Sequence, residues 1–293
     1  MRGVEQVLFD RPGPRGRRRI AVATVEAVVV LAGLVALAVH QFGAHGQLAA
    51  DRWQPFTDWL NLRFLLLGLR YTALVTAVAA VISMPAGAVI ALGRLSGRWY
   101  LHYPAVVYTE LFRSLPTLLL MYVFLLAFPA IRVDLGIVRI TGIDVPTFWN
   151  LVIAICLTGT ATIAEVFRAG ILALPAGQTE AARAIGMRYG QSMRLIVLPQ
   201  VVRAVLPLLL VQLINLLKDS TLGYAVGYTE LLYSGKILAE YVHAPIQTYL
   251  VVTALYMIVN WLITRLAHYV ERRQGRLPRF RAGRPVVTRA AAE

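Results

Sequence analysis

The sequence has few charged residues and almost no cysteine. Only 15% of its 293 residues are charged and 58% are hydrophobic, which is too apolar for an ordinary soluble domain. Cys156 is the single cysteine, so the chain can form no internal disulfide. Acidic residues are also scarce, because 15 Asp and Glu stand against 29 Lys and Arg and give a net charge of +14. The arginines gather at the termini and between apolar runs, which favours a membrane protein and disfavours nucleic acid as a partner.

The sequence also lacks the motifs of several kinds of site. It contains no Gly-x-x-x-x-Gly-Lys-Ser/Thr phosphate loop, so it is not expected to bind ATP and Mg²⁺ in that way. No Ser-His-Asp or paired-carboxylate arrangement falls in a plausible soluble cleft, so we predict no catalytic residue and no enzyme activity. The 5 histidines have no ligand spacing, so we predict no metal site and no bound cofactor.

Long apolar runs predict a helical membrane protein. The runs cover residues 20–39, 66–92, 104–128, 147–168, 200–222 and 247–270. About 20 apolar residues in a helix span the hydrocarbon core. Helix is required there because lipid offers the backbone no hydrogen-bond partner. The fold class is therefore all-α, and we expect Pro85, Pro116 and Pro207 to kink spans two, three and five.

The first apolar run allows two interpretations. Residues 1–19 form a basic tail, and the run that follows has the order of a secretory signal peptide. Leu48-Ala49-Ala50 would then be a possible cleavage site. The run of residues 20–39 is longer than a usual signal sequence, which favours a retained transmembrane helix.

Basic residues predict which side of the membrane each loop faces. The two tails and the loops that share their side of the membrane contain Arg2, Arg11, Arg15, Arg17, Arg18, Arg19, Arg94, Arg98, Arg183, Arg188, Arg194, Arg272, Arg273, Arg276, Arg279, Arg281, Arg284 and Arg289. The loops on the other side contain far fewer, among them Arg52, Arg132, Arg139 and Lys236. The positive-inside rule therefore places both termini in the cytoplasm, together with residues 175–199 and the basic tail of residues 271–293.

The loop of residues 175–199 is predicted to form a helix, a turn and a second helix. Thr179–Ile185 has helical composition, Gly186 is a natural left-handed terminator, and Tyr189–Val197 resumes the helix before the span at Pro199. Its small alanines suit close docking of another backbone. An amphipathic helix lying on the membrane fits the residues as well, so the physical argument alone leaves both interpretations open.

This loop resembles the signature of the permease subunits of ATP-binding cassette (ABC) importers. The match is Glu180-Ala181-Ala182, three residues, Gly186, nine residues, then Ile196–Pro199. The resemblance implies coupling helices that fit a groove on a separate cytoplasmic ATPase. It also implies that the following residues couple the permease to the ATPase: Gly177, Gln178, Glu180, Ala181, Ala182, Gly186, Leu198 and Pro199.

Other segments are similar to one branch of this family, the polar amino acid (histidine, glutamine, glutamate) permeases. These segments are Glu110–Pro116, Ala161–Arg168 and Lys218–Leu222. The chain departs from the branch at Ser114-Leu115, where Gly-Thr is usual, and at Thr162, where Tyr is usual. The resemblance implies a five-helix permease core over residues 63–270, to which the helix of residues 20–39 is an addition.

Charged and polar residues inside the predicted spans are candidates for a substrate path, because charges in a membrane rarely face lipid. These candidates are Glu110, Arg113, Thr162, Glu165, Gln212, Asn215, Lys218, Asp219, Ser220 and Thr221. Glu110 with Arg113, and Glu165 with Arg168, have the three-residue spacing of intrahelical pairs that only fix packing. Lys218-Asp219 offers partners for the carboxylate and ammonium of a zwitterion, or is a structural ion pair.

The resemblance implies uptake of polar amino acids by alternating access, with acidic amino acids such as glutamate favoured. Its expected partners are a cytoplasmic ABC ATPase dimer that binds ATP and Mg²⁺, a second permease subunit, an extracytoplasmic solute-binding protein and membrane lipid. The expected location is the bacterial cytoplasmic membrane. Two alternatives remain open, namely an ion-driven secondary transporter that uses Glu110 or Glu165, and a membrane scaffold that transports nothing.

Overall fold

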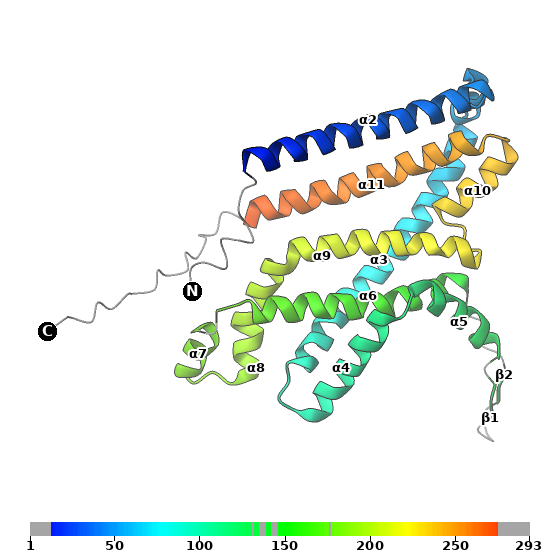
Figure 1. Ribbon diagram of the computed structural model, residues 1–293. Coiled ribbons are helices and arrows are strands. Elements are labelled where there is room, and N and C mark those ends of the chain that lie inside the picture. The colour runs from blue at the N-terminus through cyan, green and yellow to red at the C-terminus, as the bar shows by residue number, and fades with distance from the viewer. Residues whose placement is uncertain (1–12, 131, 135–138, 142–145, 176, 275–293) are drawn as a thin grey trace.

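The protein is helical, as the sequence predicts. The computed structural model describes residues 13–130, 132–134, 139–141, 146–175 and 177–274 (Figure 1). The long helices are α2 (Pro14–Ala44), α3 (Trp59–Arg94), α4 (Trp99–Ser114), α5 (Thr117–Ala130), α6 (Thr147–Leu172), α9 (Leu198–Ser220) and α11 (Pro245–Gln274). The shorter elements are the 3₁₀ helix η1 (Ala50–Phe56), α7 (Gly177–Ala184), α8 (Tyr189–Ser192), the π-helix η2 (Met193–Val197), the 3₁₀ helix η3 (Thr221–Val226) and α10 (Leu231–Tyr241). Strands β1 (Arg132–Asp134) and β2 (Arg139–Thr141) form a small antiparallel hairpin.

Among the described residues, five helical segments are long and apolar enough to cross a membrane, or six if α4 and α5 together count as one. We call the end of the bundle that carries α7 and α8 the inner end. The end that carries α10 is the outer end (Figure 1). Most of both basic tails, residues 1–12 and 275–293, lies outside the described residues.

Helices α3, α6 and α9 form the centre of the bundle. One apolar cluster joins Val75, Met121, Ile155 and Leu216 across α3, α5, α6 and α9. A second cluster, around Ile163 and Val201, lies toward the inner end. Small residues bring the backbones close, as packing between membrane helices requires. A Cβ on Gly87, for example, would lie 2.5 Å from Ile163 Cγ2.

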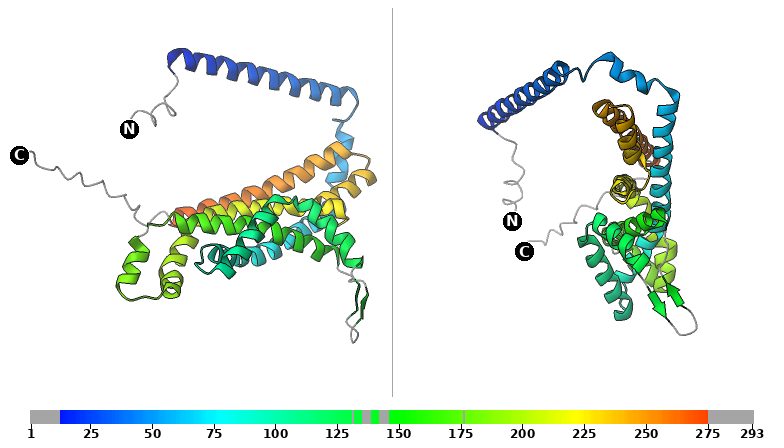
Figure 2. Two further views of the ribbon diagram at one scale, coloured as in Figure 1. Left: turned by 60° about the horizontal axis from the view of Figure 1, so that its bottom comes forward. Right: turned by 90° about the vertical axis from the view of Figure 1, so that its right-hand side faces the viewer.

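Helix α2 stands apart from this bundle. Figure 2 shows it separated from α11, and no residue of α2 is buried. Contacts hold the segment after α2 to the first turn of α11 and to the turn that precedes it. The Gln247 side chain donates to the carbonyl oxygen of Gln47, and Arg52 donates to the carbonyl oxygen of His243 at 2.7 Å. The predicted extra helix is therefore attached at the outer end, with its apolar surface uncovered.

The third predicted span is broken rather than kinked. Helix α4 ends at Ser114, α5 begins at Thr117, and their axes meet at 100°. The residue before a proline is disfavoured in helical geometry, and Leu115, which precedes Pro116, has extended geometry at φ −86° and ψ 131°. By contrast, α3 and α9 continue as single helices through Pro85 and Pro207. The prediction of one kinked helix over residues 104–128 is therefore wrong.

A buried carboxylate holds the outer end together. Glu230 is 0% exposed and precedes α10. It accepts hydrogen bonds from the backbone N–H groups of Leu232 (2.9 Å) and Tyr233 (2.7 Å), and from the Tyr256 hydroxyl of α11 (2.7 Å). Burial raises the pKa of Glu230, and these hydrogen bonds oppose the rise. The carboxylate therefore caps α10 and ties it to α11.

Replacing Glu230 with alanine is expected to destabilise the outer end by about 2–4 kcal/mol. It would leave two helix N–H groups and the partly buried Tyr256 hydroxyl without an acceptor. Thermal unfolding of the purified chain in detergent measures the effect. Glu240→Ala is the matched control, because Glu240 is an exposed acid on the same helix. Equal unfolding temperatures for the two variants would contradict the capping role.

Candidate functional site

The loop between α6 and α9 contains a rigid turn at Gly186. Helix α7 ends in a Schellman motif, in which Gly186 N–H donates to the Arg183 carbonyl at 2.9 Å and Met187 N–H donates to the Ala182 carbonyl at 3.1 Å. Gly186 has φ +82°, in the left-handed region that side chains with a Cβ disfavour. The predicted left-handed terminator is confirmed, and the turn fixes the direction of the chain between α7 and α8.

The rest of the loop connects this turn to the membrane span. Helix α8, the π-helix η2 and α9 follow one another without a break from Tyr189. The amide of Gln200 on α9 donates to the Gln178 side chain on α7 at 3.3 Å, so both ends of the loop are linked. On α7, Ala182 is buried at 2% exposure, whereas Ile185, just after the helix, is 76% exposed. A large apolar side chain thus projects from a braced polar loop.

Three helices meet in a charged cluster toward the inner end of the bundle. Arg94, the last residue of α3, donates to Glu165 on α6 at 2.8 Å and to Glu110 on α4 at 3.1 Å. Arg168 donates to the same Glu165 carboxylate through Nε at 3.0 Å, and Arg113 lies 3.9 Å from it. Glu165 therefore has three cationic neighbours and links α3, α4 and α6.

The cluster contains one of the two predicted intrahelical ion pairs, whereas the residues of the other pair bond to different partners. Glu165 and Arg168 pair within α6 as the three-residue spacing predicts. The carboxylate of Glu110 bonds instead to Arg94, and Arg113 turns toward Glu165. The sequence assigned Arg94 to a cytoplasmic loop and did not predict its ion pairs. Spacing along the chain identifies partners one turn apart on the same helix, but not partners on other helices.

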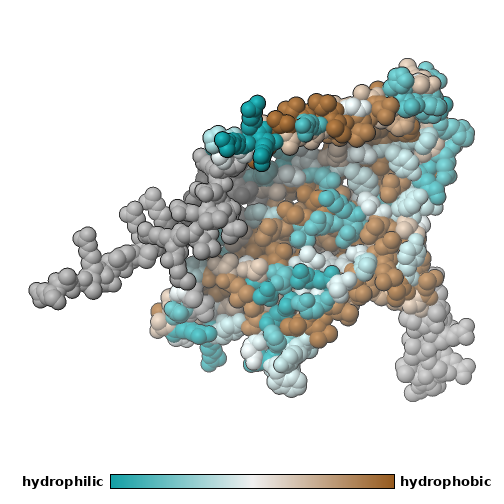
Figure 3. Space-filling view, in the orientation of Figure 1, coloured by the Kyte–Doolittle hydropathy of each residue, from teal (hydrophilic) through white to brown (hydrophobic). Residues whose placement is uncertain are grey.

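The outer half of α9 carries a polar surface. Gln212 and Asn215 lie one turn apart and their side chains hydrogen bond at 3.2 Å. Asn215 and Lys218 are exposed, beside Val211 at 50% exposure. Figure 3 shows hydrophilic residues interrupting a largely hydrophobic face in the region of α9 and α6. Amide and ammonium groups facing hydrocarbon are costly, so this surface is not expected to face lipid.

The remaining candidates lie on α6, at the end of α9 and at the start of η3, and they donate to nearby carbonyl groups, while the Ser220 hydroxyl also lies 3.5 Å from the Thr76 hydroxyl of α3. Ser220 is buried and donates to the Leu217 carbonyl at 2.7 Å, and Thr221 donates to the Lys218 carbonyl at 2.6 Å. Thr162 donates to the Thr158 carbonyl at 3.1 Å. Within the described residues, Lys218 and Asp219 form no ion pair with each other. Neighbours on a helix point about 100° apart, so a structural pair between these two residues is not supported.

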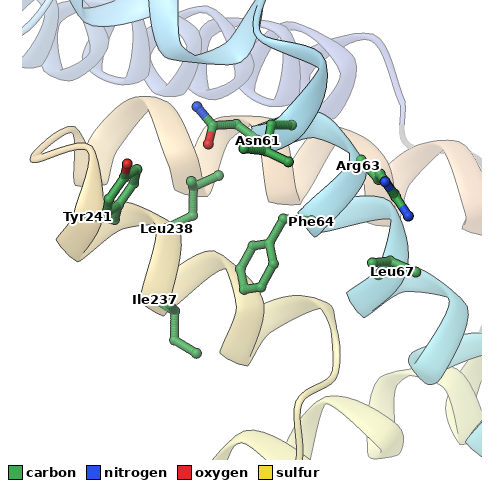
Figure 4. Close-up of a pocket in the computed structure, with 8 residues that line it drawn as sticks. Asn61, Arg63, Phe64, Leu67, Ile237, Leu238 and Tyr241 are labelled. Atoms are coloured by element: carbon green, nitrogen blue, oxygen red, sulfur yellow. The ribbon is translucent and has the colours of Figure 1, made fainter.

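The structure thus brings the predicted path residues together in two separate groups. Glu110, Arg113 and Glu165 meet around Arg94, and Gln212 and Asn215 lie together on α9. In the part of the chain that the structure describes, no hydrogen bond or ion pair joins the two groups. An apolar cleft of about 350 Å³ between α3 and α10 contains neither of them (Figure 4). Its lining includes Phe64, Ile237 and Tyr241.

Residues 83–276 match the family described as binding-protein-dependent transport system inner membrane component. The chain belongs to this family. The matched segment includes both polar groups and the whole loop from α7 to α9. Family membership confirms the predicted permease subunit, in which ATP hydrolysis is the work of a separate ATPase subunit.

Individual relatives cover most of this permease. It is 36% identical over 248 residues to the glutamate transport system permease protein GluD of Corynebacterium glutamicum, which covers 82% of this chain and 84% of that protein. It is 31% identical over 223 residues to the glutamate/aspartate import permease protein GltK of Escherichia coli, or 74% of this chain and 97% of that protein.

A solved structure of an amino acid ABC transporter with histidines shares the permease fold. The TM-score is 0.64 at 28% identity, and the match covers 74% of this chain and 98% of that chain. The methionine ABC transporter MetNI, in an inward-facing conformation, matches at a TM-score of 0.57 and 23% identity, which shows the fold alone. These matches confirm the predicted fold class, an importer permease core with an additional N-terminal helix.

Proposed function

We propose that this permease takes up polar amino acids by alternating access, with acidic amino acids such as glutamate as the first candidates. The names of the relatives, glutamate and glutamate/aspartate permeases, support this substrate class. The polar surface of Gln212, Asn215 and Lys218 on α9 supports a path for a charged solute, because it would be costly against lipid.

The proposed assembly has three kinds of partner. A solute-binding protein delivers the amino acid to the outer end, and a second permease copy or sister chain covers the polar face of α9. A cytoplasmic ATPase dimer, which holds ATP and Mg²⁺, closes against the loop around Gly186. The positive-inside rule supports this orientation, with both termini and the loop in the cytoplasm of a bacterial cell.

The coupling role of the loop rests on its geometry. Gly177, Glu180 and Ala181 lie on α7, whose direction is fixed by the turn at Gly186, while Leu198 and Pro199 open α9. Movement of α7 is therefore passed through a braced connection to a membrane helix. A loop that only rested on the membrane surface would need no link between Gln178 and Gln200.

Transport assays separate this proposal from its rivals. Liposomes that contain the permease, its ATPase and the solute-binding protein are expected to accumulate glutamate only when ATP is supplied. A panel of amino acids then identifies the substrate. Uptake by the permease alone under an ion gradient would instead support secondary transport. Absence of any uptake by a fully assembled, ATP-hydrolysing complex would favour a scaffold.

Asp219→Asn and Lys218→Met are each expected to lower uptake at saturating ATP by about tenfold. Each removes one charge that can bind the ammonium or the carboxylate of a zwitterion. The control is Lys236→Met, which removes a cation that lies on α10 over the Tyr224 ring. Assembly with the ATPase is measured for every variant. Wild-type uptake in both Asp219→Asn and Lys218→Met would remove these residues from the path.

A further inference from the structure

A large open groove lies at the inner end, on the side of α8 that faces the turn between α3 and α4. Its volume is about 1210 Å³. The apolar part of its lining includes Val89, Ile90, Leu101, Pro104, Met193 and Leu198. This inner groove is larger than most pockets for small molecules, which measure about 300–1,000 Å³. It therefore suits an elongated apolar occupant better than a single amino acid.

Three arginines provide the charge of the inner groove. Arg98 comes from the α3–α4 turn, and Arg188 and Arg194 come from the α8 side. All three are exposed, and none forms an ion pair with a carboxylate within the described residues. Among the described residues, no Asp or Glu lines the groove. The groove thus combines an apolar surface with guanidinium groups for which the described part of the chain supplies no carboxylate partner, and guanidinium is well suited to bind phosphate.

Aromatic residues indicate the depth at which the inner groove lies. Tyr100 and Tyr189 line it and are 50% and 51% exposed, and the neighbouring Trp99 is 73% exposed. Trp and Tyr concentrate where headgroups meet hydrocarbon. Anionic lipids are the abundant anions at that depth of the cytoplasmic leaflet, and basic residues near it attract them.

We propose that the inner groove binds an anionic phospholipid, with its phosphate at Arg98, Arg188 and Arg194 and its acyl chains along the apolar lining. The lipid would touch both the α3–α4 turn and the segment that links α7 to α9. Lipid binding by the permease chain does not depend on the proposed function. A further consequence, that anionic lipid supports transport, rests on the proposed transport function.

Native mass spectrometry of the full chain, titrated with phosphatidylglycerol or phosphatidylcholine, tests the proposal. Wild type is expected to bind phosphatidylglycerol at least tenfold more tightly than phosphatidylcholine. The combined variant Arg98→Gln, Arg188→Gln, Arg194→Gln is expected to lose that preference. The matched control is Arg15→Gln, Arg18→Gln, Arg19→Gln, which removes three exposed arginines from the predicted cytoplasmic end of α2 and should keep it.

A second variant tests the shape of the inner groove without changing its charge. Leu101→Trp enlarges a side chain that lines the groove and is expected to lower phosphatidylglycerol binding at least fivefold. Photoreactive phosphatidylglycerol should label residues 89–108 and 188–198 in wild type and less in this variant. The proposal would be overturned if the two triple-arginine variants lost phosphatidylglycerol binding equally. It would also be overturned if the photoreactive lipid labelled only other segments. Crosslinks showing that a second permease copy or the ATPase fills the groove would overturn it as well.

Discussion

Uptake driven by ATP is expected to fall at least tenfold when Gly186 is replaced by valine, while the permease still folds and binds its ATPase. A β-branched residue at φ +82° carries a backbone strain of about 1–3 kcal/mol. The chain can relieve that strain only by giving up the hydrogen bonds of Gly186 and Met187 to the end of α7. The direction of α7 relative to α8 would then no longer be fixed.

Gly186→Asn is the matched control for this loss. Asparagine adds a side chain of similar size but enters the left-handed region far more readily than valine. It is therefore expected to retain most uptake. The measurement is glutamate accumulation and ATP hydrolysis in the same liposomes, because uncoupling lowers accumulation while hydrolysis continues. Full accumulation in Gly186→Val would show that the turn does not transmit movement.

Glu165→Gln is expected to have the second large effect, again at least a tenfold loss of uptake. The variant leaves the guanidinium groups of Arg94, Arg168 and Arg113 around a neutral amide. Breaking a fully buried pair in this way costs about 3–5 kcal/mol, and the figure is smaller here because the Glu165 side chain is 26% exposed. The contacts that join α3, α4 and α6 would weaken together.

Glu110→Gln is the matched control, because it tests whether the effect of Glu165→Gln comes from the ion pairs of Glu165 or from the loss of any carboxylate in the cluster. It also removes one carboxylate, but the Glu110 side chain is 61% exposed, and among the described residues it forms an ion pair with Arg94 alone, at 3.1 Å. Its effect on uptake and on thermal unfolding is expected to be several-fold smaller. A loss as large as that of Glu165→Gln would contradict the central position that the structure gives to Glu165.

Elements set by local chemistry were predictable from the sequence. Apolar length identified the membrane helices, because a run of about 20 apolar residues spans the hydrocarbon as a helix whose backbone hydrogen bonds are satisfied internally. The turn at Gly186 was predictable since a glycine after a short helical segment commonly ends it in the left-handed conformation. The Glu165–Arg168 pair followed from its spacing along one helix.

Features that depend on contacts between helices were not predictable. Arg94 forms ion pairs with Glu110 and Glu165, which lie 16 and 71 positions further along the chain. The periodicity of a helix does not predict partners at such separations. Glu230 was overlooked for the same reason, because its hydrogen-bond partner Tyr256 lies on another helix, α11. The break before Pro116 could have been anticipated from the restricted geometry of Leu115, but its 100° angle depends on packing.

The central claim is that the loop around Gly186 presses on a separate ATPase. The most direct test places a photoreactive crosslinker on Ile185→Cys, after the native Cys156 is changed to alanine. Ile185 is 76% exposed beside the turn, so the label should reach a docked partner. We predict adducts with the ATPase whose yield changes when ATP is added, and none from a label on Glu240→Cys at the outer end. Adducts from position 185 with lipid alone, in a complex that transports, would contradict the account.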